Sequence, residues 1–290
     1  MMRALAQFIM RGRWQAATVA LLGSWFPIVT PATVGLVGLR LGAADGFIVL
    51  LWAVLPAVVA LWASDIGALM AYSTIAVMLV VLVSAVYLRV SMSWARTLMV
   101  LVACSTLAAV GLALLVPDLA ASLTETLGEL AAAPESTVTA TETPAATPLM
   151  AQWSQKATAG VLAYLVALSS LMALLVGRWW QALLYNPGGF QAELHNVRLT
   201  PVPALVCAVA AAYCLAVDEY QVWANVFSLP LVLAGIGLVH CAVKHYRLGV
   251  ITLAVFYVAL VLIYPALLLV AALAFADVWL NLRNRLKSTQ

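Results

Sequence analysis

Long apolar runs separated by short polar or charged stretches dominate the chain. The runs cover residues 16–39, 47–63, 66–88, 97–117, 157–177, 202–217, 222–243 and 249–282. A helix that crosses a bilayer needs about 20 residues, because each residue adds about 1.5 Å and the hydrocarbon core is about 30 Å thick. The six middle runs are therefore predicted to cross the membrane once each, whereas the first and the last need another explanation.

The charged residues predict the side on which each loop lies. Lys and Arg collect in the short loops on the cytoplasmic side of a membrane. The segment 118–152 holds five acidic residues and neither Lys nor Arg, so we expect it outside. With this anchor, 13 of the 14 Lys and Arg residues fall inside, and only Lys156 falls outside. Both chain ends are accordingly predicted to lie inside.

This assignment makes the first and last runs return to the side from which they start. Arg13 and Arg40, which flank the first run, are both assigned to the inside, and so are the basic residues around the last run. Both runs contain proline, which removes a backbone donor and clashes with the preceding helical turn. We predict helical hairpins centred on 26–31 and 264–265. The arms of the first reach only about 16 Å, which favours a re-entrant hairpin.

The composition supports the same class of protein. Of the 290 residues, 66% are hydrophobic and 9% are charged, and the mean hydropathy is +1.07. Soluble domains carry roughly 25% charged residues. A soluble enzyme, a disordered chain and a nucleic-acid-binding domain are therefore excluded. The prediction is an all-α, polytopic integral membrane bundle with six single spans and two Pro-centred terminal hairpins, embedded in a lipid bilayer.

The segment 134–150 divides the chain. It is rich in Pro, Thr, Ala and Glu and has no apolar periodicity, so we predict a flexible outside linker. It separates an N-terminal half, 1–133, from a C-terminal half, 151–290, of one membrane domain. We find no convincing sequence repeat between the halves.

The most structured polar piece is the predicted cytoplasmic loop 178–200. Its start, RWWQALLY, is typical of a helix end in the headgroup layer, where Trp and Arg are favoured. Asn-Pro-Gly-Gly predicts a turn, and an amphipathic helix is expected to follow. The loop is either a connector that orients two helices, or a docking surface for a cytoplasmic partner or a lid. Its candidate residues are Arg178, Trp179, Trp180, Asn186, Pro187, Gly188 and Gly189.

Asp277 is the acidic residue in the least polar surroundings, because it follows a long apolar run. One interpretation places it near the cytoplasmic interface, paired with Arg283. The other makes it a core-facing carboxylate that binds a cation or substrate. The chain shows no catalytic motif, the three histidines do not form a metal set, and the four cysteines lie in apolar runs. We expect no metal, no cofactor and no enzymatic activity.

RWWQALLYNPGGFQAELHNVRL and the terminal ALAFADVWLNLRNR resemble the YybS-like family of bacterial membrane proteins, a domain of unknown function. The start, RGRWQAATVALLGSWFPIVTPATVGLVGLRLG, is similar too. The resemblance implies a multi-pass protein of the bacterial cytoplasmic (inner) membrane. In architecture the family is distantly similar to the substrate-binding subunits of energy-coupling-factor vitamin transporters and to the cell-shape protein MreD. That likeness concerns the fold and transfers no binding residue.

Three functions remain open. The first is a small-solute transport component, which can require a cytoplasmic partner that supplies energy. The second is a scaffold or assembly protein that acts through homo-oligomer or partner interfaces. The third, an intramembrane enzyme, needs clustered acid–base groups, and the sequence offers almost none. Nothing in the sequence separates the first two.

Overall fold

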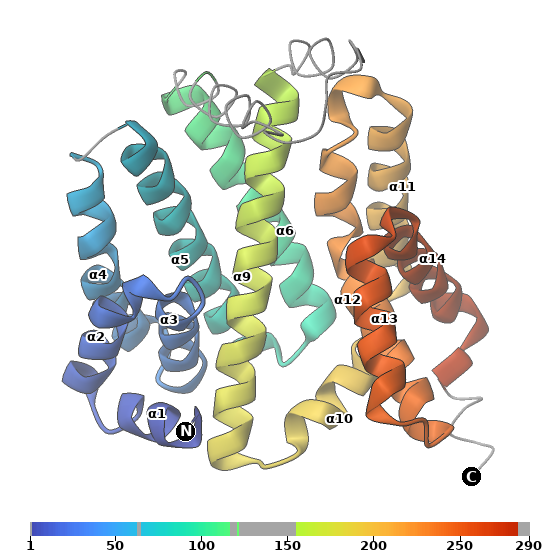
Figure 1. Ribbon diagram of the computed structural model, residues 1–290, viewed down its shortest axis with the longest axis horizontal. Coiled ribbons are helices and arrows are strands. Elements are labelled where there is room, and N and C mark those ends of the chain that lie inside the picture. The colour runs from blue at the N-terminus through green and yellow to red at the C-terminus, as the bar shows by residue number, and fades with distance from the viewer. Residues whose placement is uncertain (1, 63–64, 117–120, 122–154, 284–290) are drawn as a thin grey trace, which may run out of the picture.

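The computed structural model describes residues 2–62, 65–116, 121 and 155–283, and all regular structure in this part is helical (Figure 1). The predicted all-α membrane bundle is confirmed at this level. The predicted linker 134–150 and the last basic residues, Arg285 and Lys287, lie outside the described residues.

Within the described residues, five helices are long and apolar enough to cross a membrane alone. Two consecutive helices, bent by 68° at a short break, together reach the same length and apolar composition. Together these helices account for the six runs that were predicted to span. They are α4 (Ala43–Ala60), α5 (Asp65–Ser91), α6 (Trp94–Leu115), α9 (Gln155–Tyr185), α12 (Trp223–His245) and the broken pair α10 (Gly189–Asn196) with α11 (Pro201–Ala216).

The first run forms a helical hairpin that returns to its own side, after the short amphipathic helix α1 (Met2–Ile9). Its arms are α2 (Arg13–Leu22) and α3 (Val29–Arg40), joined through the 3-10 turn η1 (Gly23–Trp25). The arms reach about 15 and 18 Å, about half the thickness of a bilayer core, and the chain returns to the end of the molecule at which α1 lies (Figure 1). The Thr30 hydroxyl donates to the Ala20 carbonyl across the arms at 2.9 Å. Neither arm is long enough to cross a bilayer core by itself.

The last run is also broken, between α13 (Val250–Leu262) and α14 (Tyr264–Leu280), whose axes differ in direction by 116°. Ile263 is extended, with φ −113° and ψ 97°, and ends the first arm. Proline occupies the first turn of α14, where its missing N–H breaks no helical hydrogen bond. The break coincides with the predicted hairpin at 264–265.

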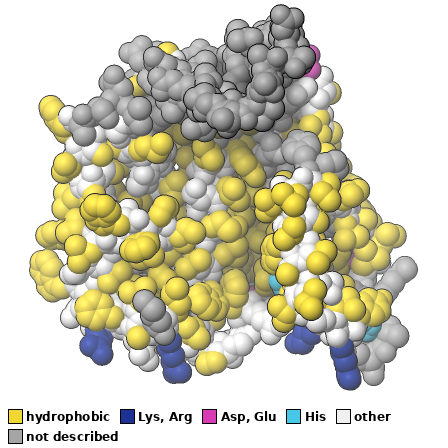
Figure 2. Space-filling view, viewed as in Figure 1, with side chains coloured by type: hydrophobic (Ala, Val, Ile, Leu, Met, Phe, Trp, Pro, Cys, Tyr) yellow, Lys and Arg dark blue, Asp and Glu magenta, His cyan; other side chains and the backbone are white. Residues whose placement is uncertain are grey.

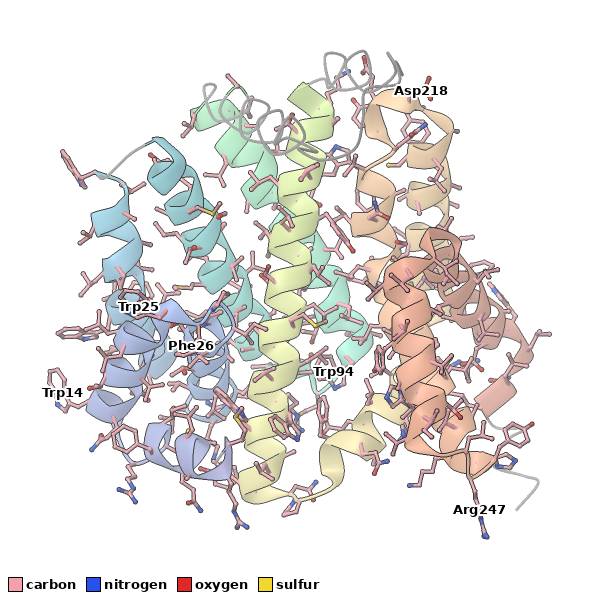
Figure 3. All side chains as sticks on the ribbon, viewed as in Figure 1. Trp14, Trp25, Phe26, Trp94, Asp218 and Arg247 are labelled. Atoms are coloured by element: carbon pink, nitrogen blue, oxygen red, sulfur yellow. The ribbon has the colours of Figure 1, made fainter. Side chains whose placement is uncertain are left out.

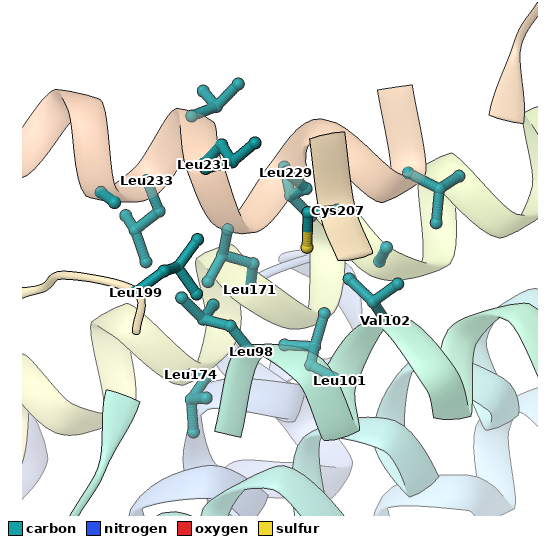
Figure 4. Close-up of a cluster of buried hydrophobic side chains, with 14 of the residues drawn as sticks. Leu98, Leu101, Val102, Leu171, Leu174, Leu199, Cys207, Leu229, Leu231 and Leu233 are labelled. Carbon is teal, nitrogen blue, oxygen red and sulfur yellow. The ribbon is translucent and has the colours of Figure 1, made fainter. Parts of the chain in front are cut away.

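The helix α3 is the central element of the N-terminal side, since it is enclosed by α2, α4, α5 and α9. Ten of its 12 residues are buried, from Thr30 to Leu39. Small residues allow this approach: a Cβ on Gly177 of α9 would lie 3.1 Å from the Ala32 carbonyl oxygen. A second apolar cluster joins α6, α9, α11 and α12, and includes Leu98, Leu101, Leu171, Leu174, Cys207 and Leu229 (Figure 4).

Charge divides the molecule into two ends around an apolar body (Figure 2). We call the end that carries Arg247 the basic end, and the opposite end, with Asp218, the acidic end (Figure 3). Lys156, the one basic residue predicted outside, lies at the acidic end, where its ammonium contacts the Glu219 carboxylate at 2.6 Å. This partner explains why a lysine is accommodated there.

Candidate functional site

The predicted loop 178–200 is built around one ion pair at the basic end. Arg178, near the end of α9, binds Glu193 of α10 with two nitrogens, one of them Nε at 2.9 Å from Oε2 and the other Nη2 on Oε1. The indole N–H of Trp94, at the start of α6, donates to the same Oε2 at 3.3 Å. A single carboxylate therefore connects three helices. Such bidentate pairs fix orientation as well as charge.

The four residues 186–189 form the predicted turn. Gly188 has φ +85°, a conformation that favours glycine, although a Cβ there would meet no atom within 4 Å. Asn186 closes the end of α9 by donating its backbone N–H to the Ala182 carbonyl at 2.8 Å, and Pro187 is exposed. The backbone of Gly189 then begins α10. Backbone conformation, and not a lack of space, requires the glycine at 188.

The two tryptophans of this segment are separated. RWWQALLY continues α9 as one 31-residue helix, so neighbouring side chains point about 100° apart. Trp179 is 39% exposed, whereas Trp180 is 2% exposed and packs in a cluster with Ile9 and Leu36. The expectation that both rings lie in the headgroup layer is wrong for Trp180, which is a core residue.

A polar cavity of about 490 Å³ lies beside this loop. Its walls come from the α5–α6 connection, the 186–189 turn and α10, and include Met92, Trp94, Asn186, Glu193 and Arg198. The cavity therefore combines the predicted loop with a helix connection that is distant in sequence.

Asp277 and Arg283 are in contact in the structure and are 1% and 4% exposed. Arg283 Nε lies 3.1 Å from Asp277 Oδ2, an ion contact in which the N–H is not directed at the oxygen. The other guanidinium nitrogens donate to the carbonyls of His195, at 2.8 Å, and Ala234, at 2.5 Å. Ala234 is 11 residues before the end of α12, about 16 Å along the helix axis, whereas His195 belongs to α10 at the basic end.

Arg198 connects the two groups of predicted residues. It lines the polar cavity, its Nε lies 3.8 Å from Asp277 Oδ2, and its Nη2 donates to the carbonyls of Asp277 and Val278, each at 2.8 Å. With two guanidinium groups against it, the Asp277 carboxylate is an ion-pair partner in this structure and not a vacant cation ligand.

A second cavity was not predicted from the sequence. It measures about 130 Å³ and lies between α9, α12 and the first turns of α14. Most of its lining is aliphatic, and its polar side chains are Tyr164, Asn225 and Ser228. The available signal was the pair of polar residues spaced three apart at the start of the otherwise apolar run 222–243. We call this cavity the inner pocket.

The polar side of the inner pocket is incompletely hydrogen-bonded. The Ser228 hydroxyl donates to the Asn225 backbone carbonyl at 3.2 Å. Within the described part of the chain, the Asn225 side-chain amide has no hydrogen-bond partner. An amide offers two N–H donors and an oxygen acceptor, so this wall can bind a polar group.

The arm α13 is tied to α12 by one side-chain hydrogen bond. His240 Nδ1 lies 3.0 Å from the Ile236 carbonyl, which can only accept, so Nδ1 carries a hydrogen. In the neutral ring, Nε2 then accepts from the Tyr257 hydroxyl at 3.3 Å. Elsewhere α13 is largely exposed, and Leu260 is its one buried residue among those described.

Among the residues that the structure describes, no group of three or more His, Cys, Asp and Glu could hold a metal ion. His195 and His240 approach each other, with ring centroids 6.4 Å apart, but His245 makes an edge-to-face contact with Tyr246 instead.

No protein-family model matches this chain, and comparisons with curated proteins and with solved structures find no match either. The resemblance to YybS-like proteins therefore stays a prediction from its sequence motifs. What the geometry establishes is a multi-pass, all-α membrane bundle with a polar cavity at its basic end and an inner pocket beside a broken helix.

Proposed function

We propose that the protein is a small-solute transport component of the bacterial cytoplasmic membrane, and not an enzyme. The observation that carries the proposal is the inner pocket, because the first turns of α14 form part of its wall through Leu267 and Leu268. Backbone that leaves the helix inside a membrane is stable where protein surrounds it or where it lines a cavity. Transporters commonly bind solutes near the midplane beside such broken helices.

The depth of the break fits this role. The arm α13 has 13 residues, about 19 Å, and begins just after Arg247 at the basic end. Its end therefore lies past the middle of a 30 Å core. Asn225 belongs to the first turn of α12, which starts at the acidic end. With the basic end inside, a solute would reach the pocket from the outside.

The polar cavity at the basic end is a candidate binding site for a partner protein on the cytoplasmic side. Arg178, Glu193 and Trp94 hold α6, α9 and α10 in a fixed arrangement there. We propose that an energising cytoplasmic protein binds at this cavity and acts on the pocket through α9 and α12.

The test uses native mass spectrometry of the full chain in nanodiscs and two adjacent substitutions. Leu268 is 38% exposed and lines the inner pocket, whereas Leu269 is 68% exposed and does not. Leu268→Trp should fill the pocket and Leu269→Trp should leave it open. We expect the wild type and Leu269→Trp to retain a small molecule that Leu268→Trp loses. A ligand-free wild type that forms a defined oligomer would overturn the proposal.

One observation favours a different function, a scaffold or assembly protein that acts through homo-oligomer or partner interfaces. At the tip of the α2–α3 hairpin, Trp25 is 86% and Phe26 is 64% exposed, about midway between the basic and the acidic end (Figure 3), which corresponds to about half the depth of a bilayer. Non-helical backbone at that depth is not stable against bare lipid. A protein surface that covers this tip would satisfy the requirement.

Native mass spectrometry also tests this second function. Truncation of the tip with Trp25→Ala and Phe26→Ala should dissociate an oligomer that forms there. Trp62→Ala is the matched control, because Trp62 is 90% exposed and lies at the far end of α4. A monomeric wild type, or an oligomer that the tip variant leaves intact, would contradict the scaffold at this surface.

A further inference from the structure

The inner pocket restricts the chemistry of the solute, if it is the transport site proposed above. Among the residues that the structure describes, none of those that line it is Asp, Glu, Lys, Arg or His. An ion that leaves water without a partner of opposite charge pays a penalty of several kcal/mol. The pocket therefore excludes anions and cations and favours an uncharged molecule.

The size of the pocket sets the size of the enclosed part. An apolar cavity of about 150 Å³ holds one benzene molecule. At about 130 Å³, the inner pocket accommodates a body of about one ring. The part of the pocket that lies farther from the acidic end has aliphatic walls, formed by Ile236 of α12 with Leu267 and Leu268 of α14. This end makes no specific polar contact.

The other end supplies hydrogen bonds. Asn225 is the third residue of α12 and Ser228 follows one turn later, so both lie toward the acidic end. The Asn225 amide can donate and accept at the same time. The Ser228 hydroxyl already donates to the Asn225 backbone, which leaves its lone pairs for a donor on the solute. A group that carries both a carbonyl and an N–H, such as a carboxamide or a lactam, matches this pair.

We propose that the inner pocket binds an uncharged molecule with an apolar body of about one ring and an amide-like end, which Asn225 and Ser228 hold. The proposal rests on the transport function and adds the solute class to it. The apolar body points toward the middle of the membrane and the polar end toward the acidic end.

Four probes of nearly equal size test the class directly on the full chain in nanodiscs. Benzamide is neutral with an amide end, toluene is neutral without one, benzoate is an anion and benzylamine is a cation at neutral pH. Saturation-transfer NMR gives their relative affinities. We expect benzamide to bind about tenfold more tightly than toluene, the value of one net hydrogen bond. Benzoate and benzylamine should not compete with benzamide.

Two variants locate the polar end. Asn225→Leu keeps the approximate side-chain volume and removes the amide, and Ser228→Ala removes the hydroxyl. Asn225→Leu should abolish the preference for benzamide over toluene and leave toluene binding unchanged, whereas Leu268→Trp should abolish both. The comparison of the four probes on the wild type needs no variant, so it remains valid if a variant fails to fold.

The outcomes separate the solute class from the transport function. If benzoate or benzylamine binds as tightly as benzamide, the neutral class is wrong and the pocket remains a binding site. If the retained ligand is a phospholipid that Leu268→Trp displaces, an acyl chain fills the pocket and the class is also wrong. If the wild type retains no ligand and binds no probe, the transport function itself is wrong.

Discussion

Asp277 and Arg283 close the end of α14 by two contacts. Besides the ion contact between their side chains, the Arg283 backbone N–H donates to Asp277 Oδ1 at 3.2 Å. The chain reverses between them at Asn281, which adopts the left-handed conformation with φ 52°. Arg283 then bonds to carbonyls of α10 and α12. This one pair therefore attaches the end of α14 to α10 and α12.

We predict that Asp277→Asn strongly destabilises the protein. Two guanidinium groups would then lie against a neutral amide, and breaking a buried ion pair costs about 3–5 kcal/mol. The free energy of unfolding from a denaturant titration in mixed micelles measures the loss. Replacing both partners, with Asp277→Leu and Arg283→Leu together, should recover part of it.

The surface pair Arg13–Asp45 is the control. Its atoms are 2.5 Å apart, but the Arg13 side chain is 63% exposed. Exposed ion pairs contribute about 0–1 kcal/mol, so Asp45→Asn should change the stability by no more than that. Equal effects of the two Asp→Asn substitutions would show that the deep pair is not a structural contact.

Close packing of α12 on its neighbours predicts a second effect. A Cβ on Gly237 would lie 2.3 Å from the Leu194 carbonyl oxygen, and one on Gly235 would lie 2.4 Å from the Val270 oxygen. Backbone atoms cannot move aside cheaply, so Gly237→Ala should cost about 1–3 kcal/mol of unfolding free energy.

Gly111→Ala provides the matched helix substitution, because a Cβ there meets nothing within 4 Å. Alanine has the better helix propensity, so this variant should be neutral or slightly more stable. The same shift in melting temperature for Gly111→Ala and Gly237→Ala in detergent would contradict a packing effect at Gly237.

Tyr257→Phe should loosen α13 without unfolding the bundle. It removes the hydroxyl that donates to His240 and retains the ring. One hydrogen bond contributes about 1 kcal/mol, so amide hydrogen exchange in 250–262 should accelerate about fivefold. Tyr213→Phe on the exposed face of α11 should have no effect. Unchanged exchange in α13 would mean that packing alone holds this arm.

The first hairpin predicts a labelling pattern for single cysteines in a chain whose four native cysteines are replaced by alanine. Arg11→Cys and Leu41→Cys flank the first hairpin and should both be protected from a membrane-impermeant maleimide in intact cells. Gln221→Cys, in the turn at the acidic end, should react. Reaction at only one flank of the hairpin would show that the segment crosses the membrane.

The positions of the helices could be predicted from the sequence, because the length, hydropathy and charge of each segment determine them. Proline positions and the parity of Lys and Arg predicted the breaks at 26–31 and 264–265, since a reversal in lipid needs a local backbone cause. The same reasoning extended α9 only to residue 177. RWWQALLY is as compatible with an interfacial helix as with the continuation of a span, and only the packing of Trp180 distinguishes them.

The inner pocket could not be predicted, because its walls come from three separate helices, and Tyr164 of α9 and Leu267 of α14 are more than 100 residues apart in the sequence. Tyr164 and Leu267 meet there through the way α9, α12 and α14 pack, and neither residue is unusual in its own segment. The contact between Asp277 and Arg283 was expected from charge and proximity in sequence. The hydrogen bonds that Arg283 donates to the carbonyls of His195 and Ala234 were not expected, because every residue has a backbone carbonyl and the sequence does not indicate which one accepts.

The enclosure of α3 has a consequence for biogenesis. The α2–α3 hairpin is synthesised first, yet the walls that enclose α3 include α9, which begins more than 100 residues later. An isolated α3 is too short to insert as a stable span. The N-terminal hairpin therefore cannot complete its packing until α9 has been synthesised. A ribosome that stalls before α9 leaves one wall of the α3 site unmade.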